Sequence, residues 1–132
     1  MTFVDTNVLL DLVINDPHWA TWSQANLEAA ALSGPPQINE VVYAELATGA
    51  DSLDEVEEFL SITGIDVAPT PRQALFLAAK AFAAYRARGG RRTGVLPDFF
   101  IGAHAAILGA PLLTRDPRRY RTYFPTLELI AP

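Results

Sequence analysis

Four acidic residues stand at positions from which they could bind one ligand together. Asp5 lies in Val-Asp-Thr-Asn, Glu45 in Ala-Glu-Leu, Asp98 in Leu-Pro-Asp-Phe-Phe and Asp116 in Leu-Thr-Arg-Asp-Pro. Three of the four follow a short apolar run typical of a buried strand, or open the helix after one. Because parallel strands of an α/β sheet end at one edge, where ligands bind, we expect the four carboxylates to converge there.

Converging carboxylates repel one another and need a positive charge among them. A divalent cation with oxygen ligands is the simplest such charge, and Mg²⁺ or Mn²⁺ is the expected occupant. The pattern predicts a metal site that orients and deprotonates a water for in-line attack on a phosphodiester. We expect Asp5, Asp98 and Asp116 to be the main ligands. Glu45 would complete the coordination through a water or position the nucleophile.

Each acid taken singly also has a purely structural explanation. Asp5, Thr6 and Asn7 are all good N-cap residues. Asp116 precedes a proline, as at a helix start, and Asp98 suits the positive end of a helix dipole. Their joint occurrence after separate strands is what favours a site. In such a site, Thr6 and Asn7 would offer a hydroxyl and an amide to a metal-bound water or a phosphate.

Helix geometry helps to choose among the neighbouring candidates. A cap at Asn39 would put Glu40 in the first helical turn, where acids are favoured for structural reasons. At about 100° per residue, the side chains of Glu40 and Glu45 point roughly 140° apart, so one site cannot easily use both. Glu45 shares its face with apolar and small residues, where a carboxylate is costly without a charged partner, and it is preferred. The same geometry points His104 away from Asp98 and favours a packed or surface-exposed histidine over a catalytic one.

Strand-like runs alternate with helical patterns, which predicts a single α/β domain over residues 1–132. The expected architecture is a mostly parallel sheet with helices on both sides. A helix over residues 99–108 is apolar nearly all round and should be central. Ser52 and Glu55 form a capping box at the start of another. The expected strands are Thr2–Asp5, Gln37–Ile38, Ile65–Val67, Pro111–Thr114 and Leu127–Ile130.

The composition indicates a globular protein and excludes several kinds of site. Half of the 132 residues are apolar, enough for a core that buries roughly two-thirds of the surface of the unfolded chain. No cysteine occurs, which excludes disulfides, zinc–thiolate sites and thiol catalysis. The N-terminus resembles no signal peptide, and no apolar run approaches the roughly 18 residues needed to span a bilayer. We therefore expect a cytoplasmic protein that does not enter membranes.

Charge is strongly segregated along the chain. The first 71 residues hold twelve acids and no Lys or Arg, whereas the remainder holds all ten bases and three acids. This suggests one surface for a polyanion and another for a cation-rich partner, although solvated helix faces could also sort this way. Arg91 and Arg92 lie in a basic, glycine-containing stretch that is the natural phosphate-binding loop. Four later arginines could extend it around Asp116: Arg115, Arg118, Arg119 and Arg121. Such contacts supply affinity without sequence choice; a solvated helix end followed by a flexible loop is the alternative.

Other chemistries fit less well. The chain has no Gly-x-Ser-x-Gly, no phosphate-binding loop ending in Lys-Ser/Thr and no Gly-x-Gly-x-x-Gly. A receiver-type phosphoacceptor domain also gathers acids at strand ends, but it would need a lysine after a late strand. The only lysine, Lys80, lies in the middle of an expected helix. A non-catalytic binding module on the same scaffold remains open.

In these motifs the chain resembles the PIN-domain family, and within it the VapC-type toxins of type II toxin–antitoxin systems. The resemblance covers essentially the whole chain and implies a five-stranded parallel sheet between helices and a Mg²⁺- or Mn²⁺-dependent endoribonuclease. We expect products with a 5′-phosphate and a 3′-hydroxyl. The matching segments are Val4–Asn7, Glu45–Gly49, Leu96–Ala105 and Leu113–Asp116.

The resemblance also implies roles for single residues and for partners. Asp5, Glu45, Asp98 and Asp116 match the acidic quartet of the family, and Thr6 and Thr114 its nearby hydroxyls. Asn39 stands where many relatives have serine, which puts a hydroxyl role there in doubt. Family members usually form homodimers whose sites face a shared groove. Their antitoxins commonly insert a basic residue among the acids, and the acidic first half of this chain would suit such a partner.

Overall fold

Five short parallel strands form one sheet in the computed structural model, which describes residues 1–91 and 94–132. The strand order is β3-β2-β1-β4-β5, and every neighbouring pair is parallel. The predicted parallel sheet is therefore confirmed, with five strands. Each strand is two residues long: β2 has the predicted bounds, and the other four strands are shorter than the runs that predicted them. The strands are β1 (Phe3–Val4), β2 (Gln37–Ile38), β3 (Asp66–Val67), β4 (Leu112–Leu113) and β5 (Leu129–Ile130).

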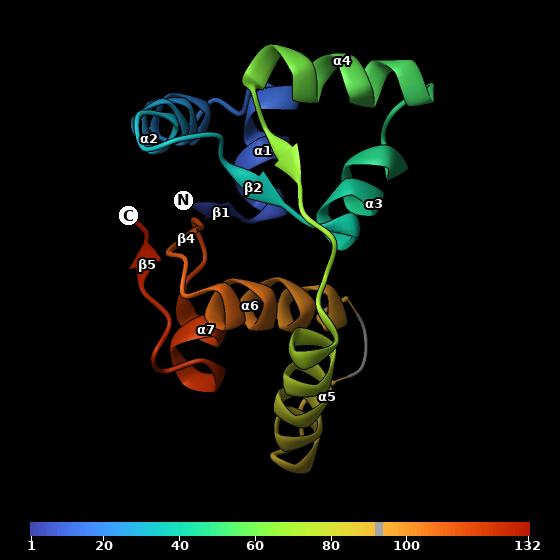
Figure 1. Cartoon of the computed structure of the whole chain (residues 1–132), viewed down its shortest axis with the longest axis vertical. Helices are drawn as coiled ribbons and strands as arrows, with labels where there is room; N and C mark the ends of the chain where they lie inside the picture. The colour runs from blue at the N-terminus through green and yellow to red at the C-terminus, as the bar shows by residue number, and fades with distance from the viewer. Residues whose placement is uncertain (92–93) are drawn as a thin grey trace.

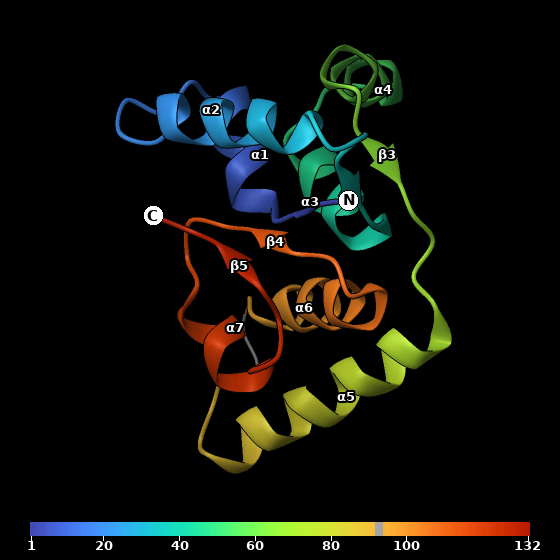
Figure 2. The ribbon, with the colours of Figure 1, turned by 60° about the vertical axis from the view of Figure 1, so that its left-hand side comes forward.

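Seven helices in the described residues connect and cover these strands. Figures 1 and 2 show α1, α2 and α4 on one side of the sheet and α5, α6 and α7 on the other. Helix α3 packs against α1, α4 and α6. The helices are α1 (Thr6–Val13), α2 (Ala20–Ala31), α3 (Glu40–Thr48), α4 (Leu53–Thr63), α5 (Arg72–Ala87), α6 (Leu96–Leu108) and α7 (Arg118–Tyr123).

The order of the strands creates a switch point between β1 and β4. From β1 the chain runs outward through β2 to the edge strand β3, then returns through α5 and α6 to β4 on the other side of β1. In open parallel sheets, ligands bind outside the carboxyl ends of the strands at such a point, because the connecting segments diverge there and leave a crevice.

The core lies on both faces of the two central strands. Phe3, Val4, Leu112 and Leu113 are fully buried, as expected for strands of a parallel sheet covered on both faces. Helix α6 is the central helix that its sequence predicts, and six of its residues are buried. None of the helices in the described residues is both long and apolar enough to cross a membrane.

Local capping fixes where α3 and α4 begin. The Asn39 side chain accepts hydrogen bonds from the backbone N–H groups of Val41 and Val42, which confirms it as the cap of α3. Ser52 caps α4 by accepting from the N–H of Glu55. The Glu55 carboxylate reaches back to the N–H of Asp51, one residue before the cap. The predicted capping box is thus formed with its reciprocal bond displaced by one residue.

Candidate functional site

Three of the four predicted acids meet at the switch point. Asp5 follows β1 directly, Asp98 lies in the first turn of α6, and Glu45 comes from α3. Their charges act on one another: repulsion by Asp5 and by Glu45 raises the pKa of Asp98, after the larger effect of burial. We call Asp5, Glu45 and Asp98 the acidic cluster. Three elements far apart in the sequence thus bring carboxylates to the edge of the sheet.

Asp5 is the most enclosed member of the acidic cluster. Only 4% of the residue is exposed, and burial raises the pKa of its carboxyl group although hydrogen bonds from Thr114 and Tyr120 oppose the rise. Both hydroxyls donate to Asp5 Oδ2 at 2.8 Å, and Asn7 Nδ2 lies 3.3 Å from the same oxygen. Asp5 stands at the N-cap of α1, but its side chain makes no capping hydrogen bond. The structural explanation of this acid as a helix cap is therefore wrong.

Glu45 and the two residues after Asp5 form a connected layer beneath the cluster. The Thr6 hydroxyl donates to Glu45 Oε1 at 2.6 Å. Asn7 donates to Asp5, and its Oδ1 accepts the backbone N–H of Arg115 at 3.3 Å. In this arrangement Thr6 and Asn7 hold the acids and the β4–α7 connection in place. Their predicted contacts with a metal-bound water or a phosphate remain predictions.

Asp98 is half-buried and carries the only ion pair that reaches the acidic cluster in the described part of the chain. Arg119 on α7 donates from Nη1 to Asp98 Oδ2 at 2.5 Å. Burial and the neighbouring Asp5 nevertheless raise the pKa of Asp98 to about 7, because they outweigh the attraction of Arg119. Desolvation and a like charge both oppose ionisation, which is how a carboxyl group comes to hold its proton near neutral pH.

Asp116 lies apart from the other three acids. Its side chain is 60% exposed, and its carboxylate is 3.7 Å from Nε of Arg118. Its backbone N–H donates to the hydroxyl of Thr114, so the main chain of Asp116 adjoins the site while its carboxylate faces solvent. The predicted place of Asp116 among the metal ligands would require this side chain to turn inward.

A second polar cluster, Asp11, Ser23 and Arg115, fixes the loop after β4. Asp11 is fully buried and accepts the Ser23 hydroxyl at 2.8 Å. Arg115 Nε donates to both oxygens of Asp11, at 2.9 and 3.1 Å, and the guanidinium lies 5.6 Å from the ring centre of Trp19. Here Arg115 ties the loop that carries Thr114 to α1 and α2. Its predicted contact with substrate phosphate remains a prediction.

The basic segment before α6 is attached to the site through Tyr85 of α5. The Tyr85 hydroxyl accepts the backbone N–H of Arg91 at 3.1 Å, and the side chain of Arg91 is exposed. The Arg119 guanidinium lies 5.6 Å from the centre of the Tyr85 ring. A Cβ at Gly90 would stand 2.4 Å from that ring, so glycine allows the segment to lie flat on it. Arg92, the other predicted phosphate ligand in this segment, lies outside the described residues.

Glu40 and His104 are engaged elsewhere. Glu40 accepts hydrogen bonds from the backbone N–H and the hydroxyl of Thr70, which lower its pKa. His104 is 1% exposed and packs 4.7 Å from the ring centre of Phe3. Its Nδ1 lies 3.3 Å from Nδ2 of Asn39, and burial lowers the pKa of its imidazole. His104 is thus a packed core residue, and Glu40 holds the connection from β3 to α5.

The donor set of the cluster suits a hard cation. Its available ligands are carboxylate and hydroxyl oxygens, which Mg²⁺ and Mn²⁺ prefer, and a positive guanidinium already stands against Asp98. Among residues 1–91 and 94–132, however, no three acidic or histidine side chains stand close enough together to hold a metal ion as they are. The residues therefore fit a divalent cation in chemistry, and binding one requires side chains to move.

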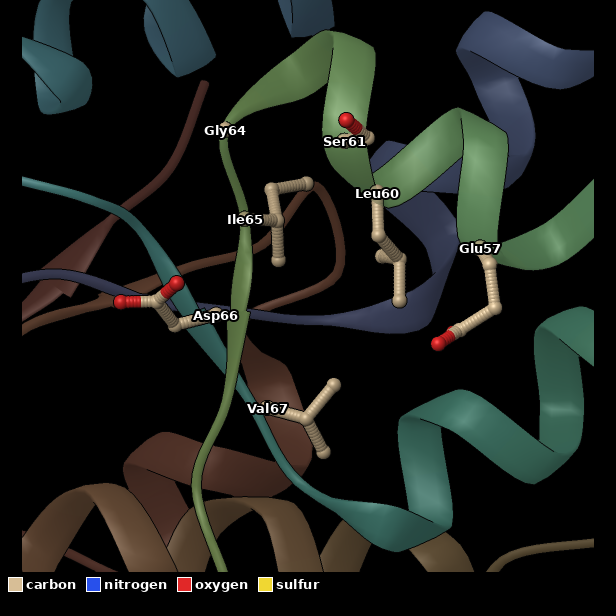
Figure 3. Close-up of a pocket in the computed structure, with 7 residues that line it drawn as sticks. All are labelled: Glu57, Leu60, Ser61, Gly64, Ile65, Asp66 and Val67. Atoms are coloured by element: carbon tan, nitrogen blue, oxygen red, sulfur yellow. The ribbon is translucent and has the colours of Figure 1, made fainter.

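A separate hollow of about 360 Å³ lies against the edge strand β3. Figure 3 shows Glu57 of α4 and Asp66 of β3 among its lining residues, with the apolar Leu60, Ile65 and Val67 between them. Asp66 is exposed. None of its lining residues belongs to the acidic cluster. This hollow offers a matched remote carboxylate for control experiments.

Sequence reasoning missed Tyr120 and the buried Asp11. Tyr120 is 1% exposed and donates to Asp5; the only signal for it was an aromatic residue one helical turn before Phe124 in an arginine-rich segment. Asp11 gave no signal in the sequence, because its partners Ser23 and Arg115 lie 12 and 104 positions away and no local pattern links them to it.

Comparisons with known proteins agree with this architecture. A profile of the PIN domain matches residues 2–125. The fold is similar to a chain of VapBC2 from Rickettsia felis bound to a DNA fragment from the promoter, with a TM-score of 0.75 at 20% identity over 99% of this chain and 98% of that one. For VapBC-1 of nontypeable Haemophilus influenzae the TM-score is 0.69 at 20% identity, covering 98% of this chain and 96% of the other. DNA-bound VapBC of Salmonella typhimurium gives 0.68 at 21% identity with the same coverage.

No curated protein sequence matches the chain. The structural similarities lie at identities that establish the fold alone, whereas the sequence profile spans nearly the whole chain. The chain belongs to the PIN domain family.

Proposed function

We propose that this chain is a divalent-metal-dependent endoribonuclease and the toxin of a toxin–antitoxin pair. The observation that carries the proposal is the convergence of Asp5, Glu45 and Asp98 at the switch point of the sheet, with the pKa of Asp98 raised to about 7. A strongly perturbed carboxyl group beside like charges is typical of a functional site, since such an arrangement is costly to the fold. Membership of the PIN domain family supports the same conclusion.

In this proposal Asp5 and Asp98 would hold Mg²⁺ or Mn²⁺, and Asp116 would join them if its side chain turned inward. The cation would lower the pKa of a bound water and neutralise charge at the phosphate. Thr114, Tyr120 and Asn7 fix the orientation of Asp5 through Oδ2. Thr6 donates to Glu45, which in this proposal would orient the attacking water. Attack on phosphorus with departure of the 3′ oxygen would leave a 5′-phosphate and a 3′-hydroxyl.

A cleavage assay with matched carboxylate variants tests the proposal. Purified wild-type chain is expected to cut single-stranded RNA with Mg²⁺ or Mn²⁺ and to lose activity in EDTA. Asp98→Asn should abolish cleavage because the amide keeps the size but not the charge of a metal ligand. Asp66→Asn removes an exposed carboxylate on β3 (Figure 3), outside the acidic cluster, and should cut at the wild-type rate.

Two results would contradict the enzyme assignment. One is full cleavage by a folded Asp98→Asn chain, and the other is cleavage that survives EDTA. Mass analysis of the fragments separates metal-activated hydrolysis from attack by the ribose 2′-hydroxyl, because only the latter leaves a 2′,3′-cyclic phosphate.

The partner proposed for the toxin is an antitoxin with a basic, amphipathic segment. A hollow of about 440 Å³ between α1, α3 and α4 is lined by apolar side chains, of which Val13 is 55% and Ile14 67% exposed. The acidic Glu55 lines the same hollow. Apolar surface beside negative charge suits a helix with one apolar and one basic face. Ile14→Glu should prevent co-purification with the small protein encoded by the neighbouring gene while RNA cleavage persists.

Homodimerisation and cytoplasmic location complete the proposal. Helix α5 presents Phe76, 67% exposed, and Leu75, 42% exposed, an apolar face that a second copy could cover. Light scattering on the isolated chain should give twice the chain mass, and Phe76→Ser should reduce it to one. A cytoplasmic chain would meet the RNA that it is proposed to cut.

A non-catalytic module on the same scaffold is the second candidate, favoured by the outward side chain of Asp116. It predicts partner binding without RNA cleavage at any metal concentration. The receiver-type alternative is weaker, since Lys80 lies over the ring of Phe76, 5.1 Å from its centre, on the surface of α5.

A further inference from the structure

Arg119 stands between the acidic cluster and the basic segment. Helix α7 carries it, and its guanidinium contacts Asp98 on one side and the ring of Tyr85 on the other. In the ion pair, 31% of the arginine side chain and 29% of the aspartate side chain remain exposed. The pair is therefore partly in water, where a charged competitor can reach it.

Asp98 is the member of the cluster that most needs a positive partner. Asp5 is held by uncharged hydroxyl and amide donors, and Glu45 by the hydroxyl of Thr6. Asp98, in contrast, faces the charges of both other acids and accepts from Arg119 alone among the hydrogen bonds of the described residues. The guanidinium occupies Oδ2 of Asp98, so a cation that takes this oxygen must displace it.

We propose that Arg119 is the built-in counter-ion of the acidic cluster, which gives up Asp98 when a divalent cation binds and then contacts a phosphate oxygen of the RNA. This inference rests on the proposed metal-dependent nuclease function. A divalent cation carries two positive charges and the guanidinium of Arg119 carries one. At sufficient concentration the cation therefore displaces the guanidinium from the carboxylate of Asp98.

The released guanidinium has a defined place to go. Its contact with the Tyr85 ring does not involve Asp98, and a guanidinium over an aromatic face is held by cation–π attraction. The hydroxyl of Tyr85 accepts the backbone N–H of Arg91, so the same ring joins Arg119 to the exposed basic segment. A planar guanidinium binds phosphate through two parallel hydrogen bonds. Arg119 would then continue the line of positive charge from Arg91 to the scissile bond.

The competing explanation is that Arg119 merely ties α7 to α6. A structural tie predicts that its loss lowers stability and leaves the affinity for metal unchanged or reduced. A displaceable counter-ion predicts the opposite effect on metal affinity, because the cation no longer has to displace it. Metal binding measured without any substrate separates the two.

Calorimetric titration of the full chain with Mn²⁺ is the first test. Arg119→Gln should bind Mn²⁺ roughly fivefold more tightly than wild type, the effect expected from losing one partly exposed ion pair. Arg121→Gln, an equal charge change at an exposed position of the same helix, should leave the affinity unchanged. Equal or weaker binding by Arg119→Gln overturns the inference alone. A wild-type chain that binds no Mn²⁺ overturns the proposed function and the inference with it.

Salt-dependent binding of a single-stranded RNA tests the phosphate contact. In a Glu45→Gln background with Mn²⁺, adding Arg119→Gln should weaken RNA binding and flatten the slope of log affinity against log salt by about 0.7, the value for one phosphate contact on a single strand. Arg119→Lys should restore the slope, since it keeps the charge. A slope unchanged by Arg119→Gln overturns the phosphate contact.

Discussion

Replacing Asp98 by asparagine should make the folded chain more stable while destroying its proposed activity. Burial and repulsion by Asp5 raise the pKa of Asp98 from 3.8 to about 7. Between these values the folded chain binds more protons than the unfolded chain, so the contribution of Asp98 to stability falls as pH rises through this window. Above it, ionised Asp98 is a net cost to the fold, and an uncharged side chain of the same shape removes that cost.

The size of the effect follows from the change in acidity. Each tenfold change in the acid dissociation constant corresponds to about 1.4 kcal/mol, so the rise would cost roughly 4 kcal/mol in full. The Asp98 side chain is 29% exposed, and the variant leaves Arg119 without its partner, so about half, roughly 2 kcal/mol, is the better expectation. For a chain of this length that corresponds to a gain of roughly 6–8 °C in Tm.

Thermal unfolding in EDTA between pH 4 and pH 9 measures this effect. The gain of Asp98→Asn over wild type should be small near pH 4, grow through pH 7 and level off above it. Asp116→Asn is the matched control, since its carboxylate is 60% exposed and only 3.7 Å from a guanidinium nitrogen, and it should not change Tm measurably. A Tm at pH 8 equal to or below that of wild type would show that Asp98 is not strained, and the electrostatic reasoning for the site would fail.

Two further substitutions test the packing around the site. For each, the free energy of unfolding is measured by urea denaturation, and a shift of the midpoint at constant m-value reports the change in stability. Gly102→Ala should lose about 1–3 kcal/mol, because its Cβ would stand 2.6 Å from the ring of Phe124 and 3.0 Å from that of Tyr120; a wild-type midpoint would mean that these rings move freely. Asp11→Ala should lose about 3 kcal/mol, since it removes the buried partner of Arg115. Asp11→Asn should lose less, because it keeps a hydrogen-bonding oxygen and removes only the charge; a wild-type midpoint for Asp11→Asn would show that the charge contributes nothing.

The sequence predicted the sheet and the convergence of three acids because both depend on local patterns. Apolar runs mark strands buried on both faces, and an acid directly after such a run must emerge at the carboxyl end of the sheet. Asp5 follows this rule. Glu45 was chosen from helical angles, and the structure turns it toward the cluster through Thr6.

The direction of a side chain in a loop is not a local property. Asp116 also follows a strand, yet its carboxylate faces Arg118 and solvent, because the loop after β4 is shaped by Arg115 on Asp11 and by the hydroxyl of Thr114. Arg119 pairs with a residue 21 positions away. The sequence groups several arginines after Asp116, but only packing decides which of them faces the acids.

The three side chains that donate to Asp5 have a consequence for how this residue is read in related proteins. One oxygen of this carboxylate ties the end of a central strand to Asn7, to the loop after β4 and to Tyr120 on α7. A related protein without catalytic activity would still need a hydrogen-bond acceptor at the position of Asp5 in order to fold, because these donors would otherwise lack a partner. The persistence of this aspartate in a relative is therefore poor evidence that the relative still cuts anything. Ionised Asp98, in contrast, destabilises the fold. In relatives that have lost catalysis, Asp98 is therefore the acid expected to be replaced first.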